Sequence, residues 1–317
     1  MEGSVVQAEF NDFECFTEAI GDYDMRIKQL DSGRFRGGIQ RISCGAVTIN
    51  NFTATARVEA LGGPPPGVLT FGIPTQRCEA FVWRHLQSDA NTIQIYRPDT
   101  ELALITRPFF EAIDVSISEA EMNHVCGLWE FPDIDSMIGD REMAICSRQD
   151  LKLLRSKLQS VCRVLTKYPK RLEYDTDLQE ILICEIPALI IAALVSSRAT
   201  GSGARPAPRN RLFPKALEYM RDTADRGVSV GTVCSEVGIG MRSLQREFRE
   251  CYDMTPKAYL QACRLNNIYR ELHGACPKTT RIVDVASRQG FWHMSQLAAD
   301  YRRLFGELPS VTLNRSC

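Results

Sequence analysis

Leu244-Gln-Arg-Glu-Phe-Arg-Glu-Cys-Tyr-Asp-Met-Thr-Pro256 decides the fold of the C-terminal part of this 317-residue chain, because a related stretch follows 53 residues later. The second copy reads Leu297-Ala-Ala-Asp-Tyr-Arg-Arg-Leu-Phe-Gly-Glu-Leu-Pro309. In both copies large apolar side chains recur at four-residue spacing, which is typical of the buried face of an α-helix. The proline at the end of each copy prevents the helix from continuing far beyond it.

A shorter helix and a tight turn are expected before each copy. Ser229 is a suitable N-cap for a helix over residues 230–237, and Gly238 can adopt the left-handed turn conformation that follows. In the second copy Thr280 takes the cap position and Gly290 the turn position. A short helix, a turn and a longer helix form the helix-turn-helix plan, in which the second helix enters the major groove of DNA.

A further helix is expected over residues 256–274, between the two copies. A stiff connector of this kind would hold the two longer helices at a fixed separation. A separation of about one turn of duplex, roughly 34 Å, lets both helices face the same side of the DNA.

These residues resemble the DNA-binding domain of the AraC/XylS family of bacterial transcription regulators. The resemblance covers about residues 213–313 and is carried by Leu244-Gln-Arg-Glu-Phe248, Thr255-Pro-Lys-Ala-Tyr259, Arg264-Leu265, Ile282-Val-Asp-Val-Ala286, Gly290-Phe291, Ser295, Phe305-Gly306 and Pro309-Ser310. It implies an all-helical domain with two helix-turn-helix units that binds double-stranded DNA, in a protein that often activates transcription together with RNA polymerase. Asp253 departs from the family, which prefers glycine there, although Asp tolerates the left-handed conformation.

The expected DNA contacts lie on the outward faces of the two longer helices. Arginine can bind guanine and glutamine can bind adenine through two hydrogen bonds, and the first turns of these helices meet the base edges. By the resemblance and this chemistry, the base-contacting candidates are Arg242, Gln245, Arg246, His293, Ser295 and Gln296. The candidates for phosphate contacts, which lie deeper in the helices, are Arg249, Arg302 and Arg303. A solvated charge remains the alternative for each arginine, and a helix cap for Ser295.

The charge distribution supports a division into two domains. The formal net charge of the chain is −1, but residues 205–317 hold 18 Lys and Arg against 11 Asp and Glu, whereas residues 1–204 hold 20 against 28. A basic domain beside an acidic one is typical of a nucleic-acid-binding protein with a separate module. The Gly-, Ser- and Pro-rich residues 197–210 lie where the sign changes. We therefore expect a front domain over residues 1–196, a linker over 197–210 and a DNA-binding domain over 211–317.

The front domain is expected to be β-rich and then helical, which makes the whole chain α+β. Residues 35–118 contain several short alternating runs separated by turn residues, typical of an antiparallel sandwich or barrel. In order and length, this cupin-like part followed by helices over 119–196 resembles the sensing and dimerising half of many AraC-type regulators.

A leucine-rich seam follows in the helical part. Its apolar residues recur at alternating spacings of three and four over two heptads: Leu151, Leu154, Leu158, Val161 and Leu165. Two interpretations stay open at this stage, a contact in a homodimer and a helix lying on the domain's own core.

A small barrel can enclose one small-molecule effector. The residues that suit such a pocket by type are Trp83, Arg84, Tyr96 and Arg97, with His85 and Arg107 beside them. For each of them a core aromatic or a surface arginine is the simpler interpretation. A protein partner in place of a small molecule is the alternative means of control.

Catalysis is not expected. The front domain holds only His85 and His124 and no H-x-H pattern, so the His and carboxylate cluster of a cupin metalloenzyme is missing. No phosphate-binding loop or nucleophile motif stands out, and we expect no cofactor, metal or catalytic residue. The twelve cysteines form no C-x-x-C pair, which favours reduced thiols. The N-terminus lacks a secretory pattern, and Glu185 and Pro187 interrupt the most apolar run, residues 181–195. A cytoplasmic, nucleoid-associated protein without a membrane partner is expected.

Overall fold

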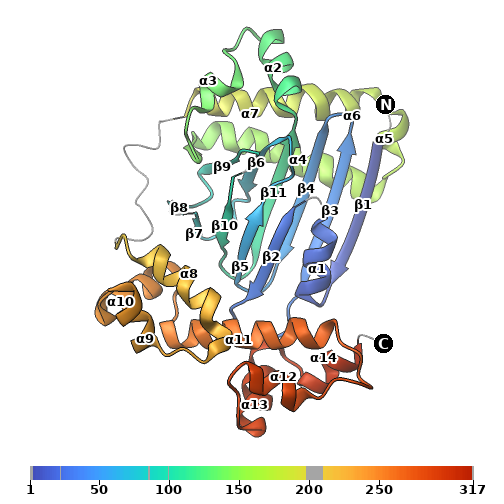
Figure 1. Ribbon diagram of the computed structural model, residues 1–317. Helices are drawn as coiled ribbons and strands as arrows, with labels where there is room; N and C mark the ends of the chain where they lie inside the picture. The colour runs from blue at the N-terminus through green and yellow to red at the C-terminus, as the bar shows by residue number, and fades with distance from the viewer. Residues whose placement is uncertain (1–2, 22, 85, 99, 198–209, 316–317) are drawn as a thin grey trace.

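The computed structural model describes residues 3–21, 23–84, 86–98, 100–197 and 210–315. Two β-sheets with flanking helices form the front part, and helices alone form the C-terminal part (Figure 1). This arrangement confirms the α+β class expected from the sequence. Residues 198–209, which include most of the expected linker, lie outside the described residues.

The front part is built on two antiparallel sheets. The first has seven strands in the order β1-β3-β4-β11-β6-β9-β12, and the second has five in the order β2-β5-β10-β7-β8. The strands are β1 Gly3–Phe10, β2 Asp24–Gln29, β3 Gly37–Cys44, β4 Val47–Ala54, β5 Val58–Gly63, β6 Leu69–Pro74, β7 Phe81–Trp83, β8 Leu86–Ser88, β9 Thr92–Tyr96, β10 Leu102–Ile105, β11 Phe110–Ile117 and β12 Met143–Ile145.

Side-chain alternation along the strands decides which face meets which layer. On β3, Ile39 belongs to the core between the sheets, whereas Ile42 belongs to the core under the helices. On β11, Ala112 points to the first core and Ile113 to the second. Because successive side chains of a strand point to opposite faces, the long central strands can be buried on both sides. The seven-stranded sheet is therefore the middle layer of the front part.

The β-rich region is wider than the sequence predicted. β1 and β2 precede Phe35, with helix α1, Phe13–Ile20, between them, and β12 interrupts the region expected to be wholly helical. No side chain of β1 is buried, because β1 is an edge strand that pairs only with β3. Its sequence therefore shows no clear apolar alternation. β12 has three residues, too few for a pattern to be detected.

The helices after β11 cover the outer face of the seven-stranded sheet. They are α2 Glu119–Leu128, α3 Ile134–Ile138, α4 Arg148–Lys167, α5 Arg171–Tyr174, α6 Thr176–Glu180, the π-helical turn η1 Ile181–Glu185 and α7 Ile186–Val195. The structure corrects one interpretation of the leucine-rich seam on α4. Its five side chains, Leu151, Leu154, Leu158, Val161 and Leu165, are buried in the core beneath the sheet, so a dimer contact through them is wrong. The alternating spacing reflects packing on the chain's own core.

Residues Thr176–Val195 form a continuous apolar helical stretch that is long enough to cross a membrane by length and composition. Half of this stretch is buried, and Ile186, Ile190 and Leu194 belong to the core shared with α4. Its packing makes it a core helix of the front domain.

Between the two sheets lies a small cavity with one buried acid. The cavity has a volume of about 60 Å³. Asp114 lines it and accepts a hydrogen bond of 2.9 Å from the Tyr23 hydroxyl. Burial raises the pKa of Asp114 to about 7, although the Tyr23 hydrogen bond acts in the opposite direction. The space is well below the roughly 150 Å³ of a cavity that binds benzene.

The pKa of Asp114 predicts how stability depends on pH. A carboxyl whose folded pKa exceeds its unfolded value of 3.8 stabilises the fold most below pH 3.8, and this contribution is lost as pH rises to about 7. The variant Asp114→Asn cannot ionise. We therefore expect it to melt at a higher temperature than the parent protein at pH 8, with a smaller difference at pH 5. Thermal unfolding at both pH values measures this, with the exposed Asp140→Asn as a matched control that should show no such trend.

Candidate nucleic-acid interface

The C-terminal part contains two helix-turn-helix units joined by a long helix. The helices are α8 Phe213–Thr223, the 3-10 turn η3 Ala224–Arg226, α9 Val230–Val237, α10 Met241–Tyr252, α11 Pro256–His273, α12 Ile282–Arg288, α13 Met294–Phe305 and α14 Pro309–Arg315. The first unit is α9 and α10, the second is α12 and α13, and α11 runs between them (Figure 1). The repeat identified in the sequence therefore corresponds to a structural repeat.

The ends of the first unit's helices agree with the sequence. The Ser229 hydroxyl accepts a hydrogen bond of 3.1 Å from the backbone N–H of Thr232, and Gly238 ends α9 in the left-handed conformation at φ +75°. In the second unit Gly290 turns the chain at φ +78°, as expected. Thr280 is not the N-cap of α12, however. That position belongs to Arg281, whose side chain makes no capping hydrogen bond.

The longer helices end alike but for different reasons. Asp253 and Gly306, equivalent positions of the repeat, both adopt the left-handed conformation. A Cβ atom on Gly306 would approach Arg34 of the front domain to 2.5 Å. The Asp253 carboxylate instead lies 3.3 Å from Arg57 and 3.2 Å from Arg107, two cations of the front domain. Asp253, which stands where the family prefers glycine, thus uses its side chain for a contact between the domains.

The predicted DNA contacts on α10 share one exposed face. Arg242, Gln245, Arg246 and Arg249 are exposed, whereas Leu244 is buried. Arg246 lies 3.1 Å from the buried carboxylate of Glu247, so its guanidinium is partly neutralised. In the part of the chain that the structure describes, Arg242 and Arg249 have no ion pair within 4 Å.

The predicted contacts on α13 are also exposed. His293 is the N-cap residue, and Ser295 and Gln296 follow in the first turn. Ser295 is therefore not the cap. Farther along, Arg302 and Arg303 are exposed, and Arg303 lies 2.6 Å from Asp300.

Trp292 is an exposed residue of the second unit that is not among the contacts expected from the sequence. This side chain is 75 % exposed and lies in the turn directly before the His293 cap. Its position next to the first turn of α13 makes it a further candidate for a DNA contact. An apolar residue in a sequence is first assigned to the core, and only the tertiary structure shows that it points outward.

Aromatic side chains hold each longer helix in its unit. Phe248 and Tyr252 of α10 pack with Phe213 of α8, at ring-centroid distances of 5.2 and 6.3 Å. In the second unit, Phe305 of α13 stacks on Phe13 of the front domain at 5.8 Å. The core of the second unit is therefore completed by a residue from α1.

A buried carboxylate connects the first unit to the front sheets. Glu59 of β5 is fully buried, and its carboxylate accepts hydrogen bonds from the hydroxyls of Tyr252 at 2.7 Å and Tyr259 at 2.9 Å. Arg221 lies 2.7 Å from it and Lys28 lies 3.1 Å from it. Burial would raise the pKa of Glu59, but the two cations and the hydrogen bonds hold it at about 2. Glu59 is thus an anion shared by both domains.

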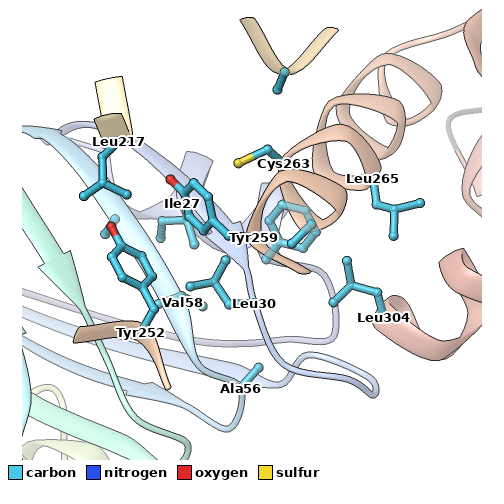
Figure 2. Close-up of a cluster of buried hydrophobic side chains, with 14 of the residues drawn as sticks. Ile27, Leu30, Ala56, Val58, Leu217, Tyr252, Tyr259, Cys263, Leu265 and Leu304 are labelled. Carbon is cyan, nitrogen blue, oxygen red and sulfur yellow. The ribbon is translucent and has the colours of Figure 1, made fainter. Parts of the chain in front are cut away.

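Apolar packing and a side-chain amide extend this contact. Figure 2 shows Ile27, Leu30 and Val58 of the front domain beside Tyr252 and Tyr259. On the next face of α11, the buried Asn266 amide pairs with the backbone N–H and C=O of Gln29, both at 2.9 Å. The amide completes the backbone pairing at the end of β2, so α11 is fixed in register on the sheet.

A second polar cluster connects α11 and α14 to α1. Asp12, Cys15 and His273 present ligand-type atoms within 4.8 Å of one another. The Asp12 oxygen that faces His273 is Oδ2. This oxygen already lies 2.6 Å from the Arg315 guanidinium and accepts a hydrogen bond from the Tyr269 hydroxyl. A cation at this oxygen opposes a metal ion, because like charges repel. We assign the cluster to the contact between domains.

The structure does not bring the four expected effector residues into one pocket. Trp83 is a core residue whose indole N–H donates to the Glu142 carbonyl at 3.0 Å. Tyr96 lines the small inner cavity, and Arg97 forms an ion pair with Asp135. Arg84 pairs with Glu142 at the edge of an interdomain cleft of about 280 Å³. Arg107 pairs with Asp253, and His85 lies outside the described residues. The expectation of one pocket is wrong because Trp83 and Tyr96 end strands and point into the core, whereas Arg84 and Arg97 follow the strand ends and pair with carboxylates.

The Glu59 contact predicts a loss of stability when its charge is removed. Glu59→Gln leaves Arg221 and Lys28 near a neutral group in a dry site. We expect the free energy of unfolding to fall by about 3–5 kcal/mol, the usual cost of breaking a buried pair. Urea unfolding measures this at pH 7. Glu101→Gln, which removes an exposed carboxylate at the cleft, is the matched control and should change little.

The Glu59 contact also determines the pH range over which this carboxylate stabilises the fold. Because the folded pKa of Glu59 lies below 4.5, its contribution is present above pH 4.5 and is lost as pH falls toward about 2. Equal stability of the parent protein and Glu59→Gln at pH 7 would contradict the role given to this carboxylate.

Comparison with known proteins supports the assignment of the C-terminal part as a pair of helix-turn-helix units. A helix-turn-helix domain family matches residues 233–315. The thc operon regulatory protein of Rhodococcus erythropolis is 30% identical over 130 residues, which are 41% of this chain and 39% of the relative. The XylDLEGF operon transcriptional activator of Pseudomonas putida is 31% identical over 108 residues, which are 34% of this chain and 33% of the relative. The matches thus span well under half the length of these relatives.

Among solved structures, the AraC-like transcriptional activator CuxR aligns with a TM-score of 0.44 at 12% identity, over 83% of this chain and 94% of that one. The family match over residues 233–315 falls on the paired helix-turn-helix units, with their short helix, turn and exposed longer helix. The C-terminal domain of this chain is thus similar to the DNA-binding part of AraC/XylS regulators.

Proposed function

We propose that the protein is a sequence-specific DNA-binding transcription regulator, acting as an activator, whose front domain controls its C-terminal domain. The observation that carries this proposal is that both longer helices, α10 and α13, expose the polar side chains of their first turns. In a helix-turn-helix unit this turn meets the base edges in the major groove.

The proposed base contacts are those expected from the sequence. Arg242, Gln245 and Arg246 act on α10, and His293, Ser295 and Gln296 act at the start of α13. Arg249, Arg302 and Arg303 hold phosphates, and Trp292 contacts the DNA beside His293. Arg242, Arg249 and Arg302 are exposed and have no ion pair within the described part of the chain. Of these three, Arg242 represents the base contacts and Arg302 the phosphate contacts.

Substitution of Arg242 and of Arg302 tests which side chains contact bases and which contact phosphates. We expect Arg242→Ala to weaken binding to the specific site by about 1–3 kcal/mol while affinity for scrambled DNA changes little. We expect Arg302→Ala to weaken binding to both duplexes and to reduce the slope of affinity against salt by about 1. Genome-wide mapping of bound DNA supplies the specific site, and fluorescence anisotropy then measures both affinities.

Arg148→Ala is the matched control, because Arg148 is an exposed arginine at the start of α4 in the front domain. It should bind both duplexes like the parent protein. Equal losses on specific and scrambled DNA for Arg242→Ala would refute its reading role, and no salt-sensitive binding to any duplex would refute the proposed function.

Control by a small-molecule effector is the first candidate for the front domain, and control by a protein partner is the second. A ligand that binds only the folded state raises the melting temperature, so a thermal-shift screen against metabolites distinguishes them. RNA polymerase is the proposed partner at the promoter. The proposed homodimer uses a surface other than the buried seam of α4, and light scattering of the purified protein measures its mass.

A further inference from the structure

A polar groove lies between α4 and the strands of the seven-stranded sheet. Its volume is about 720 Å³, within the range of small-molecule sites. One face of α4 forms one wall, through side chains at three- and four-residue spacing that include Lys152, Arg155, Gln159 and Arg163. The opposite wall comes from β3, β4, β11 and residues 75–77. Hydroxyl and amide groups make up most of the remaining surface.

The groove is basic although the domain around it is acidic. Arg77, Lys152, Arg155 and Arg163 line it, with Glu111 as the only carboxylate of the lining. Residues 1–204 carry 20 basic against 28 acidic side chains, so this gathering of cations runs against the domain's own charge. Within the described residues none of the four cations has a carboxylate within 4 Å. Their positive charge is therefore left for an anion from outside.

Arg155 shows that the groove is built rather than formed by mobile surface side chains. It is 6 % exposed, and its guanidinium donates to the carbonyl of Pro74 at 2.7 Å and to that of Ala90. These neutral acceptors fix the position of the guanidinium but do not cancel its charge. A fixed guanidinium loses little freedom when it binds a phosphate group, which it can contact through two parallel hydrogen bonds.

The groove also contains an acceptor without a donor. The Oδ1 atom of Asn51 is buried, and no hydrogen-bond partner for it exists among the described residues. A buried acceptor left unpaired costs about 1–3 kcal/mol, and a ligand hydroxyl would remove that cost. The groove thus presents cations for an anionic group and an acceptor for a hydroxyl.

We propose that this groove binds a soluble phosphate ester that carries hydroxyl groups, such as a sugar phosphate. Arg155 and Arg163 hold the phosphate, Lys152 and Arg77 add charge, and Asn51 accepts a hydrogen bond from the sugar. The inner cavity of about 60 Å³ is too small for this class of ligand, and in the interdomain cleft Arg221 is already paired with Glu59. The further assignment of this ligand as the effector rests on the proposed function.

Isothermal titration of the full chain with fructose 1,6-bisphosphate, and separately with pyrophosphate, tests the site. We expect saturable binding of one equivalent of the bisphosphate. Arg163→Gln and Lys152→Gln, both at exposed positions, should each weaken it roughly tenfold, the effect of losing one charge-assisted hydrogen bond. Asn51→Ala should weaken the binding of the bisphosphate but leave the affinity for pyrophosphate unchanged, because pyrophosphate has no sugar hydroxyl that could donate a hydrogen bond to Asn51.

Arg148→Gln is the matched control on α4, outside the groove, and should bind like the parent protein. Absence of saturable binding by either probe would overturn the proposal, and so would an equal loss in Arg148→Gln, which would indicate unspecific attraction. Weaker binding of scrambled duplex DNA by Arg163→Gln, without binding of either small phosphate, would also overturn it and would make the groove a nucleic-acid contact.

Affinity for the specific duplex, measured with and without the bisphosphate, tests the effector assignment separately. We expect the bisphosphate to change this affinity. Binding of the bisphosphate without such a change would overturn the effector role alone, whereas failure to bind any duplex would overturn the proposed function and leave the phosphate site in place.

Discussion

A single buried carboxylate, that of Glu59, organises the contact between the two domains. It belongs to a strand of the front domain, yet two tyrosines and an arginine of the C-terminal domain bind it. A charge in a dry site is costly unless cations and hydrogen bonds surround it, so the elements that supply them must be in place together. The positions of α8, α10 and α11 relative to β2 and β5 follow from this requirement.

The second unit is held by different chemistry at the other end of α11. Phe13 completes its aromatic core, while Asp12 and Glu14 face Arg315 and Arg270. Each unit is thus attached to the front domain separately, with the Asn266 amide fixing the helix between them. The relative position of α10 and α13 therefore depends on the front domain as well as on α11.

The two sides of the seven-stranded sheet differ in how much open space they contain. The space between the sheets is almost filled by side chains, and its one buried acid is held by Tyr23. A polar space of about 720 Å³ lies instead outside the sandwich, beside α4, where four cations have no carboxylate partner among the described residues. The apolar stripe of α4 packs on the core while the adjacent polar stripe lines this groove. One helix thus supplies both the stability of the domain and its proposed ligand site.

Features that depend on local pattern could be predicted from the order of the amino acids alone. Four-residue spacing on the two repeated helices, the Ser229 cap and the Gly238 turn specify backbone conformation within a few residues, and most strands over residues 35–118 show turn signals at their ends. The outward face of α10 followed from the same periodicity.

Features that depend on residues far apart in the chain became visible only in the folded molecule. Glu59 and Tyr259 are 200 residues apart, and nothing in either local sequence indicates that they meet. The alternation of the α4 seam fitted a dimer contact and a core equally, because periodicity shows that a face is apolar but not what covers it. Trp83 and Arg84 are adjacent in sequence yet lie in different environments, since the strand ends at Trp83 and the backbone turns at Arg84, which has φ +51°.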